Sequence, residues 1–366
     1  MGTAPLSEGA VRTPLAPTIS SDHVVFRVAD WDSAMEKVEL FQEVERPRLG
    51  PPFSFDEDES TWHLRFERPD ADRIEYMLHL IHKNYGEEWI NDPGNPLIAP
   101  GPFGAKSVIE WPEYAAPAWL EQDAPAGTKQ EIQITTRSPR ATFRVILWSS
   151  PGLDPIDPAP LLVAHDGPEY DELSSLTHLL EVKHAQGELP AMRAALIAPV
   201  ERDNSYSASA AYSRAFAYDL LPGIERLAPL PHGRSMRIGM GASLGGLAML
   251  HIHRTGPATF GGLFLQSGSF FRQRSDKQES GFARFRRISR FLGQVLTADD
   301  WLHPIAVTMT CGTIEENLHN NRATRDALAR QAYEVRLVEN RDGHNWVGWR
   351  DTFDPHLIDL LQRMWS

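Results

Sequence analysis

Residues 239–246 read Gly-Met-Gly-Ala-Ser-Leu-Gly-Gly, and this stretch decides how the second half of the chain folds. An apolar run, residues 236–240, leads into it, and a stretch of small and apolar residues, 244–253, follows its serine. We therefore predict that Ser243 lies at a sharp turn from a strand into a helix, where flanking glycines let the two elements pass closely. Such a turn exposes the serine hydroxyl. It also sets the N–H of Leu244 and the positive end of the helix beside any oxyanion formed there.

The composition is that of an ordinary globular chain. Of the 366 residues, 42% are hydrophobic and 23% are charged, and this length favours two domains. The formal net charge of -13 argues against general binding of nucleic acid or of anionic membranes, because both partners need a basic surface. We therefore expect neither among the partners of this protein.

The single cysteine and the N-terminus bear on the compartment. Cys311 excludes an intramolecular disulfide framework and a cysteine-rich zinc site, and its apolar surroundings, residues 305–311, predict a buried structural thiol. Residues 1–21 are rich in Pro, Ala, Ser and Thr and lack the apolar stretch of a signal peptide. No window approaches the roughly 18 apolar residues of a membrane span. We expect a cytoplasmic protein with a flexible leader over residues 1–21.

The first domain is predicted to be a small β-sandwich over residues 22–126. Short runs alternate or stay apolar between turn residues, as strands do, at 24–28, 37–40, 62–66 and 75–81. Residues 91–96, Asn-Asp-Pro-Gly-Asn-Pro, form a turn cluster. The stretch 114–127 is rich in Ala and Pro without a helical stripe, so we place the linker there and begin the second domain at residue 127.

The second domain, residues 127–366, is predicted to be a doubly wound α/β domain of the α/β-hydrolase type. Its strand candidates are mostly apolar, which suits strands covered on both faces: 130–136, 143–149, 161–165, 195–200, 237–240, 262–265, 306–311 and 334–338. Its helix candidates carry apolar residues three and four apart: 172–185, 210–227, 244–254, 321–331 and 351–365. Strands that alternate with helices build a mainly parallel sheet, and Ser243 follows the fifth strand.

A serine nucleophile needs a base, and the base needs an orienting acid. In α/β hydrolases the chain order is serine, acid, histidine. His344 follows the eighth strand and is the predicted base. Glu315 and Glu316 both follow the seventh strand. We favour Glu315, which can alternatively be read as a helix-start glutamate that balances the helix dipole. Two aspartates are weaker candidates for the acid: Asp342 and Asp299.

The second oxyanion donor is expected in the loop after the third strand, residues 165–170. Pro168 has no N–H, which leaves the amide of Gly167 or of Glu169 as the partner of the Leu244 amide. The predicted chemistry is acyl transfer, in which the serine attacks an ester carbonyl while the histidine takes its proton. Water then cleaves the acyl-enzyme with the same base.

A basic segment, residues 272–290, stands out in an otherwise acidic chain. It holds seven basic and two acidic residues and follows the sixth strand. It suits an anionic ligand near the catalytic edge, or it is a solvated helix face. Trp346, two residues after the base, is a candidate for an aromatic pocket. No metal site is predicted, because His251 and His253 point apart at a two-residue spacing on a helix.

With these residues in view, the sequence resembles the enterochelin (ferric enterobactin) esterase family within the esterase-D-like α/β hydrolases. The likeness rests on seven stretches that span both domains: 75–76, 91–96, 103–108, 165–167, 241–246, 312–315 and 343–346. The resemblance implies an immunoglobulin-like first domain and hydrolysis of catecholate siderophore esters inside the cell, so that iron can be released. It implies no catalytic cofactor, since the iron belongs to the substrate.

The resemblance also gives the basic residues a purpose, because ferric catecholates are anionic. It implies a substrate-binding set made of Arg202, Arg272, Arg284, Arg286, Arg287 and Trp346. The sequence departs from the family pattern in two places. Asp342 and Asn345 replace a glycine and an aspartate around His344, and Ser205 replaces a glutamate after Arg202. These departures put the identity of the siderophore in doubt.

Two other functions compete with this one. The first is an esterase for feruloyl or acetyl esters of carbohydrate, with the sandwich as a glycan-binding module, against which the lack of a signal peptide counts. The second is a protein that binds a ferric siderophore without hydrolysing it, against which the serine, glutamate and histidine set argues.

Overall fold

The fold is described from a computed structural model over residues 14–231, 233–256 and 259–365. The chain divides into two compact units after Tyr114, at the start of the stretch predicted as linker. The predicted leader lies outside the described residues up to position 13. Within its remainder Thr18–Ile19 forms a short strand, β1.

Unit 1 holds two antiparallel sheets. One has the order β1-β2-β6-β5, where β2 is His23–Ala29, β5 is Ser54–Asp56 and β6 is Thr61–Glu67. The other has the order β4-β3-β7-β10-β9, and β8 also pairs with β7. Its strands are β3 (Met35–Gln42), β4 (Leu49–Pro52), β7 (Arg73–His82), β8 (Gly86–Ile90), β9 (Ile98–Ala99) and β10 (Lys106–Glu110).

The buried faces of the two sheets meet at aromatic residues. Phe26 of β2 and Tyr76 of β7 are both fully buried, with ring centroids 4.7 Å apart. The four strands predicted in this unit correspond to β2, β3, β6 and β7. They could be predicted because their residues alternate between apolar and polar or stay apolar. The strands of unit 1 that were not predicted are only two to five residues long, which is too short for a clear alternation of apolar and polar residues. Strand β8 is also almost entirely exposed, so it has no apolar face to detect. The immunoglobulin-like assignment of this unit stays a prediction.

Unit 2 is built on an eight-stranded sheet of order β11-β12-β14-β13-β15-β16-β17-β18. Each of the eight predicted strands is present. The six strands from β13 to β18 run parallel to one another, whereas β11 and β12 are antiparallel. The strands are β11 (Thr128–Arg137), β12 (Arg140–Ser149), β13 (Leu161–His165), β14 (Arg193–Ile197), β15 (Arg237–Ala242), β16 (Gly262–Gln266), β17 (Ala306–Gly312) and β18 (Glu334–Asn340). Cys311 on β17 is buried, as predicted.

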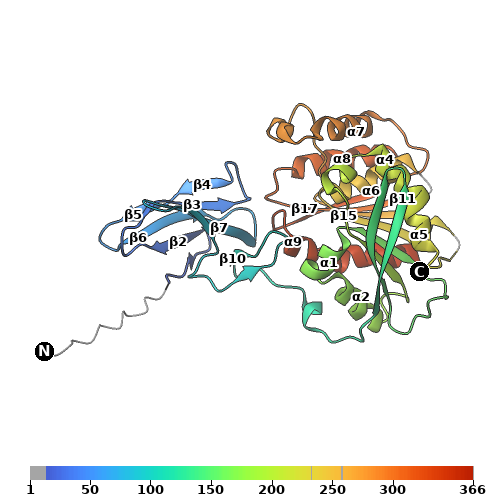
Figure 1. Ribbon diagram of the computed structural model, residues 1–366, viewed down its shortest axis with the longest axis horizontal. Coiled ribbons are helices and arrows are strands. Elements are labelled where there is room, and N and C mark those ends of the chain that lie inside the picture. The colour runs from blue at the N-terminus through green and yellow to red at the C-terminus, as the bar shows by residue number, and fades with distance from the viewer. Residues whose placement is uncertain (1–13, 232, 257–258, 366) are drawn as a thin grey trace. The chain divides into compact units, whose positions relative to one another are not determined.

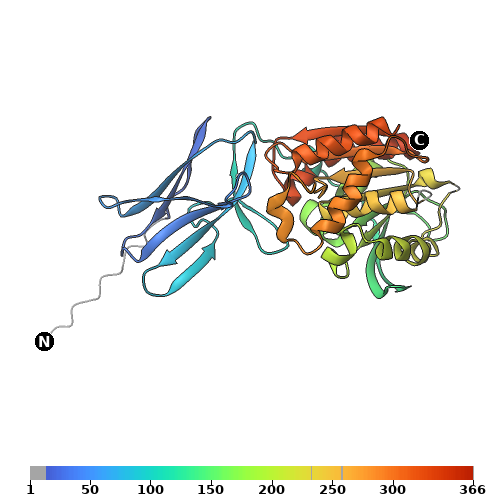
Figure 2. The same ribbon diagram turned by 90° about the horizontal axis from the view of Figure 1, so that it is seen from above.

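Helices cover both faces of this sheet (Figure 1, and from above in Figure 2). Consecutive strand residues point to opposite faces, so Val163 packs with one helical layer and Leu162 with the other. The first layer holds α4 (Ala210–Ala215), α5 (Leu221–Glu225), α6 (Leu244–Thr255), α7 (Phe285–Thr297) and α8 (Leu318–Arg330). The second holds α1 (Gly167–Ser174), α2 (Leu176–Ala185) and α10 (Ile358–Trp365).

Three predicted helices are interrupted. Ser175 adopts a left-handed conformation and separates α1 from α2. The stretch predicted at 210–227 is split by a π-helical turn, Phe216–Leu220, just before Pro222, which lacks an amide donor. The stretch predicted at 351–365 likewise begins with a π-helical turn, Phe353–Leu357. Two short helices, α3 (Arg202–Tyr206) and α9 (Trp346–Arg350), were not predicted.

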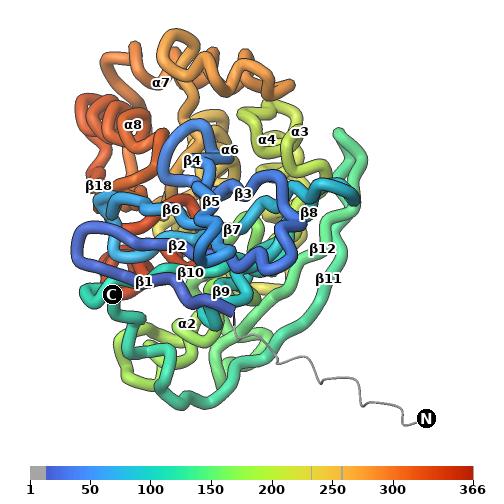
Figure 3. The backbone as a smooth tube through the Cα atoms, turned by 90° about the vertical axis from the view of Figure 1, so that its left-hand side faces the viewer, coloured from blue at the N-terminus to red at the C-terminus, as the bar shows by residue number. Residues whose placement is uncertain are grey.

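Helix α7 was also absent from the predicted helices, although its sequence carries the signal. Phe285, Ile288 and Leu292 recur at helical spacing and are buried, while arginines occupy exposed positions between them. The helix packs against α8. Figure 3 shows α7 and α8 side by side. The basic segment therefore includes an amphipathic helix with an arginine-rich outer face.

Three buried histidines make the fold sensitive to acid. Burial lowers the pKa of His165 to about 3 and the pKa values of His251 and His253 to about 4. Each is neutral when folded, whereas the unfolded chain takes up the proton below a pKa of about 6.5. We therefore expect the free energy of unfolding to fall as the pH drops from about 6.5 toward 4, by about 2 kcal/mol per histidine at pH 5.

Chemical unfolding at pH 7.5 and at pH 5 measures this loss. The matched variant is His251→Gln, which removes one titrating ring whose Nδ1 lies 2.7 Å from the hydroxyl of Ser213. We expect the stability of this variant to drop less between the two pH values than that of the wild type. An equal drop would show that His251 does not titrate on unfolding.

Candidate active site

Ser243 stands between β15 and α6 with φ 56° and ψ -122°, a backbone conformation that is strained for a residue with a Cβ. A Cβ on Gly241 would lie 2.5 Å from the backbone carbon of Gly245, and one on Gly246 would lie 2.9 Å from the oxygen of Gly241. Only glycine therefore allows this close crossing of strand and helix. The turn predicted from residues 239–246 is present, and it holds the serine half-buried at the carboxyl end of the sheet.

Glu315 and His344 meet beyond the ends of β17 and β18. The Nδ1 of His344 lies 2.7 Å from Oε2 of Glu315. The glutamate side chain is 2% exposed and the histidine side chain 35% exposed. The carboxylate is therefore buried, whereas the imidazole ring is accessible to solvent. The other carboxylate oxygen, Oε1, accepts the N–H of Gly312 at 2.7 Å and the hydroxyl of Ser267 at 2.5 Å.

The other candidates for the acid lie differently. Glu316 is exposed on the same loop, and Asp299 is exposed after α7. Asp342 is buried, and its Oδ1 accepts the N–H of Gly343 at 2.6 Å and the side-chain amide of Asn345 at 2.7 Å. The two residues that depart from the family pattern around His344 thus bond to each other and brace the loop that carries the histidine.

Two serines that the sequence analysis missed belong to this region. Ser267 bonds to Glu315, as above, and also accepts the indole N–H of Trp349 at 2.9 Å. The Oγ of Ser269 lies 3.1 Å from the Oγ of Ser243. Their position is the signal that could have found them, since three polar residues, Gln266, Ser267 and Ser269, directly follow an apolar run at the catalytic edge of the sheet.

The predicted oxyanion donors begin two helices. Leu244 is the first residue of α6 and Gly167 the first of α1, and the first amides of a helix lack acceptors within the helix. A Cβ on Gly167 would lie 2.2 Å from Cα of Leu196, so this position admits only glycine. Burial is the main cause that raises the pKa of Glu169. Gly167 and Glu169 both lie in the first turn of α1, so the amide of either residue stays a candidate for the partner of Leu244.

Arg202 pairs with the loop that carries Gly167. Its Nε donates to Oδ1 of Asp166 at 2.9 Å and its Nη2 to Oδ2 at 2.7 Å, a bidentate pair. Asp166 is buried, whereas the arginine side chain is 36% exposed. This pair orients the loop after β13, and the predicted role of Arg202 in substrate binding stays a prediction.

The remaining predicted substrate-binding residues are spread over α7 and the loop before it. Arg287 donates to the backbone oxygens of Ser207 and Asn204, both at 2.5 Å, which ties α7 to the end of α3. Arg272 donates to the hydroxyl of Ser275 at 3.0 Å. Arg284 and Arg286 are exposed.

Aromatic rings surround the base. Trp349 lies edge-on to His344, with ring centroids 5.0 Å apart. Trp346 lies edge-on to Trp349 at 4.9 Å and to Tyr170 at 5.2 Å. Of these rings, that of Trp349 packs directly against His344, and Trp346 and Tyr170 pack behind it.

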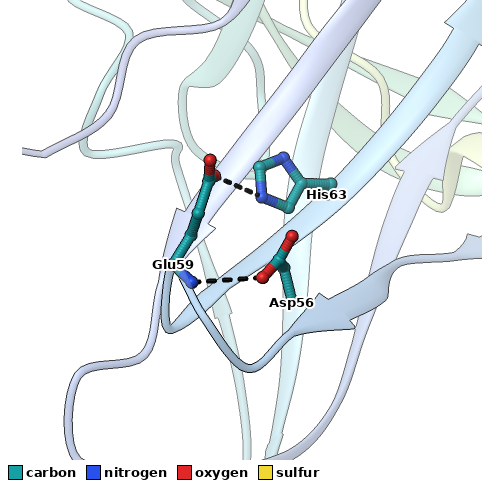
Figure 4. A group of neighbouring side chains, drawn as sticks. All are labelled: Asp56, Glu59 and His63. Atoms are coloured by element: carbon teal, nitrogen blue, oxygen red, sulfur yellow. Dashed lines mark hydrogen bonds and ion pairs between the residues drawn. The ribbon is translucent and has the colours of Figure 1, made fainter.

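One group among the described residues has metal-ligand chemistry, and it lies in unit 1. Asp56, Glu59 and His63 come together at the β5–β6 hairpin (Figure 4). Asp56 accepts the backbone N–H groups of Asp58 at 2.9 Å and Glu59 at 3.1 Å, and Glu59 pairs with His63 at 3.2 Å. These contacts account for the cluster as a hairpin turn.

Within the described ranges, no helix combines the length and the apolar character that crossing a membrane requires.

No family model matches the sequence. The iron(III) enterobactin esterase of Escherichia coli O6:H1 (strain CFT073) is 26% identical over 310 residues, which are 81% of this chain and 73% of that protein. The crystal structure of the enterochelin esterase from Shigella flexneri superposes with a TM-score of 0.76 at 20% identity and covers 97% of each chain.

A ferulic acid esterase superposes less closely, with a TM-score of 0.55 at 15% identity over 66% of this chain and 100% of that chain. The α/β class predicted from the sequence is confirmed by these shared folds. Similarity to the iron(III) enterobactin esterases extends over most of the sequence and, in structure, over nearly the whole chain. The comparisons therefore confirm the resemblance of this chain to the enterochelin esterase family.

Proposed function

We propose that the protein is a serine esterase that hydrolyses the ester bonds of ferric catecholate siderophores such as enterobactin, and so aids the release of iron inside the cell. The observation that carries this proposal is the 2.7 Å contact between Glu315 and His344. It lies at the same edge of the sheet as the strained turn of Ser243, because all three residues follow parallel strands.

The contact with Glu315 defines the state of the base. A neutral histidine that donates its Nδ1–H to a carboxylate carries its lone pair on Nε2. Nε2 is then the atom that takes the hydroxyl proton as Ser243 Oγ attacks the ester carbonyl. The buried carboxylate also stabilises the imidazolium that forms.

The attack moves negative charge onto the carbonyl oxygen. The proposed donors to this oxyanion are the amide of Leu244 and the amide of Gly167 or Glu169, and one such donor typically supplies about 3 to 4 kcal/mol of transition-state stabilisation. Collapse of the intermediate breaks the ester bond, and the imidazolium of His344 protonates the leaving alkoxide. A water molecule then repeats the sequence on the acyl-enzyme, with His344 again as base.

The substrate class rests on the relatives and on local charge. The curated relatives are named iron(III) enterobactin esterases, and a related structure was determined in the presence of enterobactin. In this chain Arg284 at the start of α7 and Arg286 and Arg290 within it are exposed, and their positive charge attracts an anionic ferric catecholate. The iron is cargo, and the serine chemistry requires no cofactor.

The test is a hydrolysis assay read by mass spectrometry. Iron-loaded and iron-free enterobactin are incubated beside a feruloyl ester, with wild type and with the Ser243→Ala variant. We expect the wild type to hydrolyse the ester bonds of the catecholate lactone, giving open-chain products and finally dihydroxybenzoyl-serine, and to cleave the feruloyl ester far more slowly. Preferential cleavage of the feruloyl ester would favour the carbohydrate esterase instead. Tight binding without cleavage would favour a ferric-siderophore-binding protein.

A further inference from the structure

Two hydroxyl groups on one short segment reach two different members of the candidate triad. The segment is Ser267-Gly268-Ser269, which directly follows β16, and all three residues are buried. Ser267 bonds to the acid Glu315, and Ser269 bonds to the nucleophile Ser243. Because the two serines are two residues apart, any movement of this segment would change both contacts together.

The direction of the Ser267 hydrogen bond follows from its partners. The indole N–H of Trp349 can only donate, and it points at Oγ of Ser267 at 2.9 Å. Oγ therefore acts as acceptor toward the tryptophan and uses its one proton toward Oε1 of Glu315. The Ser267 hydroxyl therefore donates its hydrogen bond to the Glu315 carboxylate, whose other oxygen contacts His344.

The direction of the Ser269 bond follows from the reaction. The distance between the two Oγ atoms, 3.1 Å, allows either hydroxyl to donate. In the proposed mechanism the Ser243 proton goes to the histidine, so Ser269 must be the donor to Oγ of Ser243. A donor at this position stabilises the negative charge that develops on the nucleophile. The backbone N–H of Ser269 also donates to the backbone carbonyl oxygen of Ser243 at 3.1 Å, which fixes Ser269 relative to the turn that carries Ser243.

Two asparagines of α8 and the loop before it hold this segment. Asn321 accepts the N–H of Gly268 and donates to its oxygen, both at 3.1 Å. Asn317 donates to the oxygens of Ser267 at 3.1 Å and Gly268 at 3.2 Å. Ser267 itself adopts a left-handed backbone with φ 48°. The segment is therefore fixed by side chains at each peptide, as a positioning element requires.

We propose that Ser267 and Ser269 are positioning residues that orient the acid and the nucleophile through one rigid segment, with Ser269 donating a hydrogen bond to Oγ of Ser243. This inference rests on the proposed function, since it assumes that Ser243 is a nucleophile. It adds two residues to the site and explains why polar side chains lie buried at the end of an apolar strand.

The test measures how fast Ser243 reacts with a fluorophosphonate probe, which reports nucleophile activation without any natural substrate. The variants are Ser269→Ala and Ser267→Ala. The matched control is Ser213→Ala, which removes a buried hydroxyl bonded to His251 instead. We expect Ser269→Ala to slow labelling about threefold to tenfold at every pH. Ser267→Ala removes one hydrogen bond to the Glu315 carboxylate. The carboxylate charge then acts more strongly on His344, so the midpoint of the labelling pH profile should shift upward. The control should label like the wild type.

The outcomes separate this inference from the function beneath it. Absence of labelling at Ser243 in the wild type would contradict the proposed function. Normal wild-type labelling, together with Ser269→Ala and Ser267→Ala variants that match the control in rate and in pH profile, would overturn only the positioning role. If Ser269→Ala does not fold, Ser269→Cys takes its place, because a thiol is similar in shape and a weaker donor. The same slowing is expected from it.

Discussion

Replacement of Ser243 by alanine is expected to abolish ester hydrolysis. Alanine retains the Cβ that the strained turn already accommodates at φ 56°, so the backbone should keep its conformation while the attacking oxygen is lost. In serine hydrolases the loss of the nucleophile alone costs on the order of 10⁵-fold or more in kcat. What remains is the activity that binding and the oxyanion donors provide. The measurement is kcat on a neutral aryl ester and on enterobactin.

The same variant separates hydrolysis from binding. Affinity for the ferric siderophore is measured by fluorescence quenching and is expected to stay within about threefold of the wild type, because Ser243 contributes one polar atom to the site. Ser213→Ala, with its buried hydroxyl elsewhere in the unit, serves as the control for general effects on folding. Hydrolysis that survives within about tenfold of the wild type would remove Ser243 from the mechanism.

The sheet of unit 2 could be predicted from the sequence because strands covered on both faces read as continuous apolar runs. The catalytic loops could be placed for the same reason. Ser243, Glu315 and His344 each come directly after such a run, and the carboxyl ends of neighbouring parallel strands share one edge. The periodic pattern of apolar residues could not decide between Glu315 and Glu316. These two residues are adjacent in a loop, and only the course of the backbone determines which of them points inward.

Contacts between distant loops could not be predicted in this way. Arg202 lies between Glu201 and Asp203 in the sequence, and only the fold brings it to Asp166, thirty-six positions earlier. Ser267 and Ser269 have no pattern that marks them, because their roles depend on a left-handed backbone and on asparagines some fifty residues away. In unit 1 the shortest strands were missed because two or three residues cannot display a period of two.

The second large effect is expected at Glu315. The Glu315→Gln variant keeps the shape of the side chain but replaces one acceptor by a donor. Its neighbours are the N–H of Gly312 and the hydroxyl of Ser267, which both donate to Oε1. The glutamine oxygen must therefore face them, and its NH₂ group then faces Nδ1 of His344. That contact favours the tautomer with the proton on Nε2, which cannot accept the serine proton.

We expect this wrong tautomer to lower kcat by about 10³- to 10⁴-fold, as a matching change in another serine hydrolase does. Glu316→Gln is the matched control, because it makes the same chemical change one position away on an exposed side chain. Its kcat should stay within about twofold of the wild type, the range expected of an exposed position away from the reacting atoms. Thermal unfolding of both variants separates lost chemistry from lost structure. A larger loss of kcat at Glu316 than at Glu315 would assign the acid to Glu316 and would mean that the buried contact with His344 is structural.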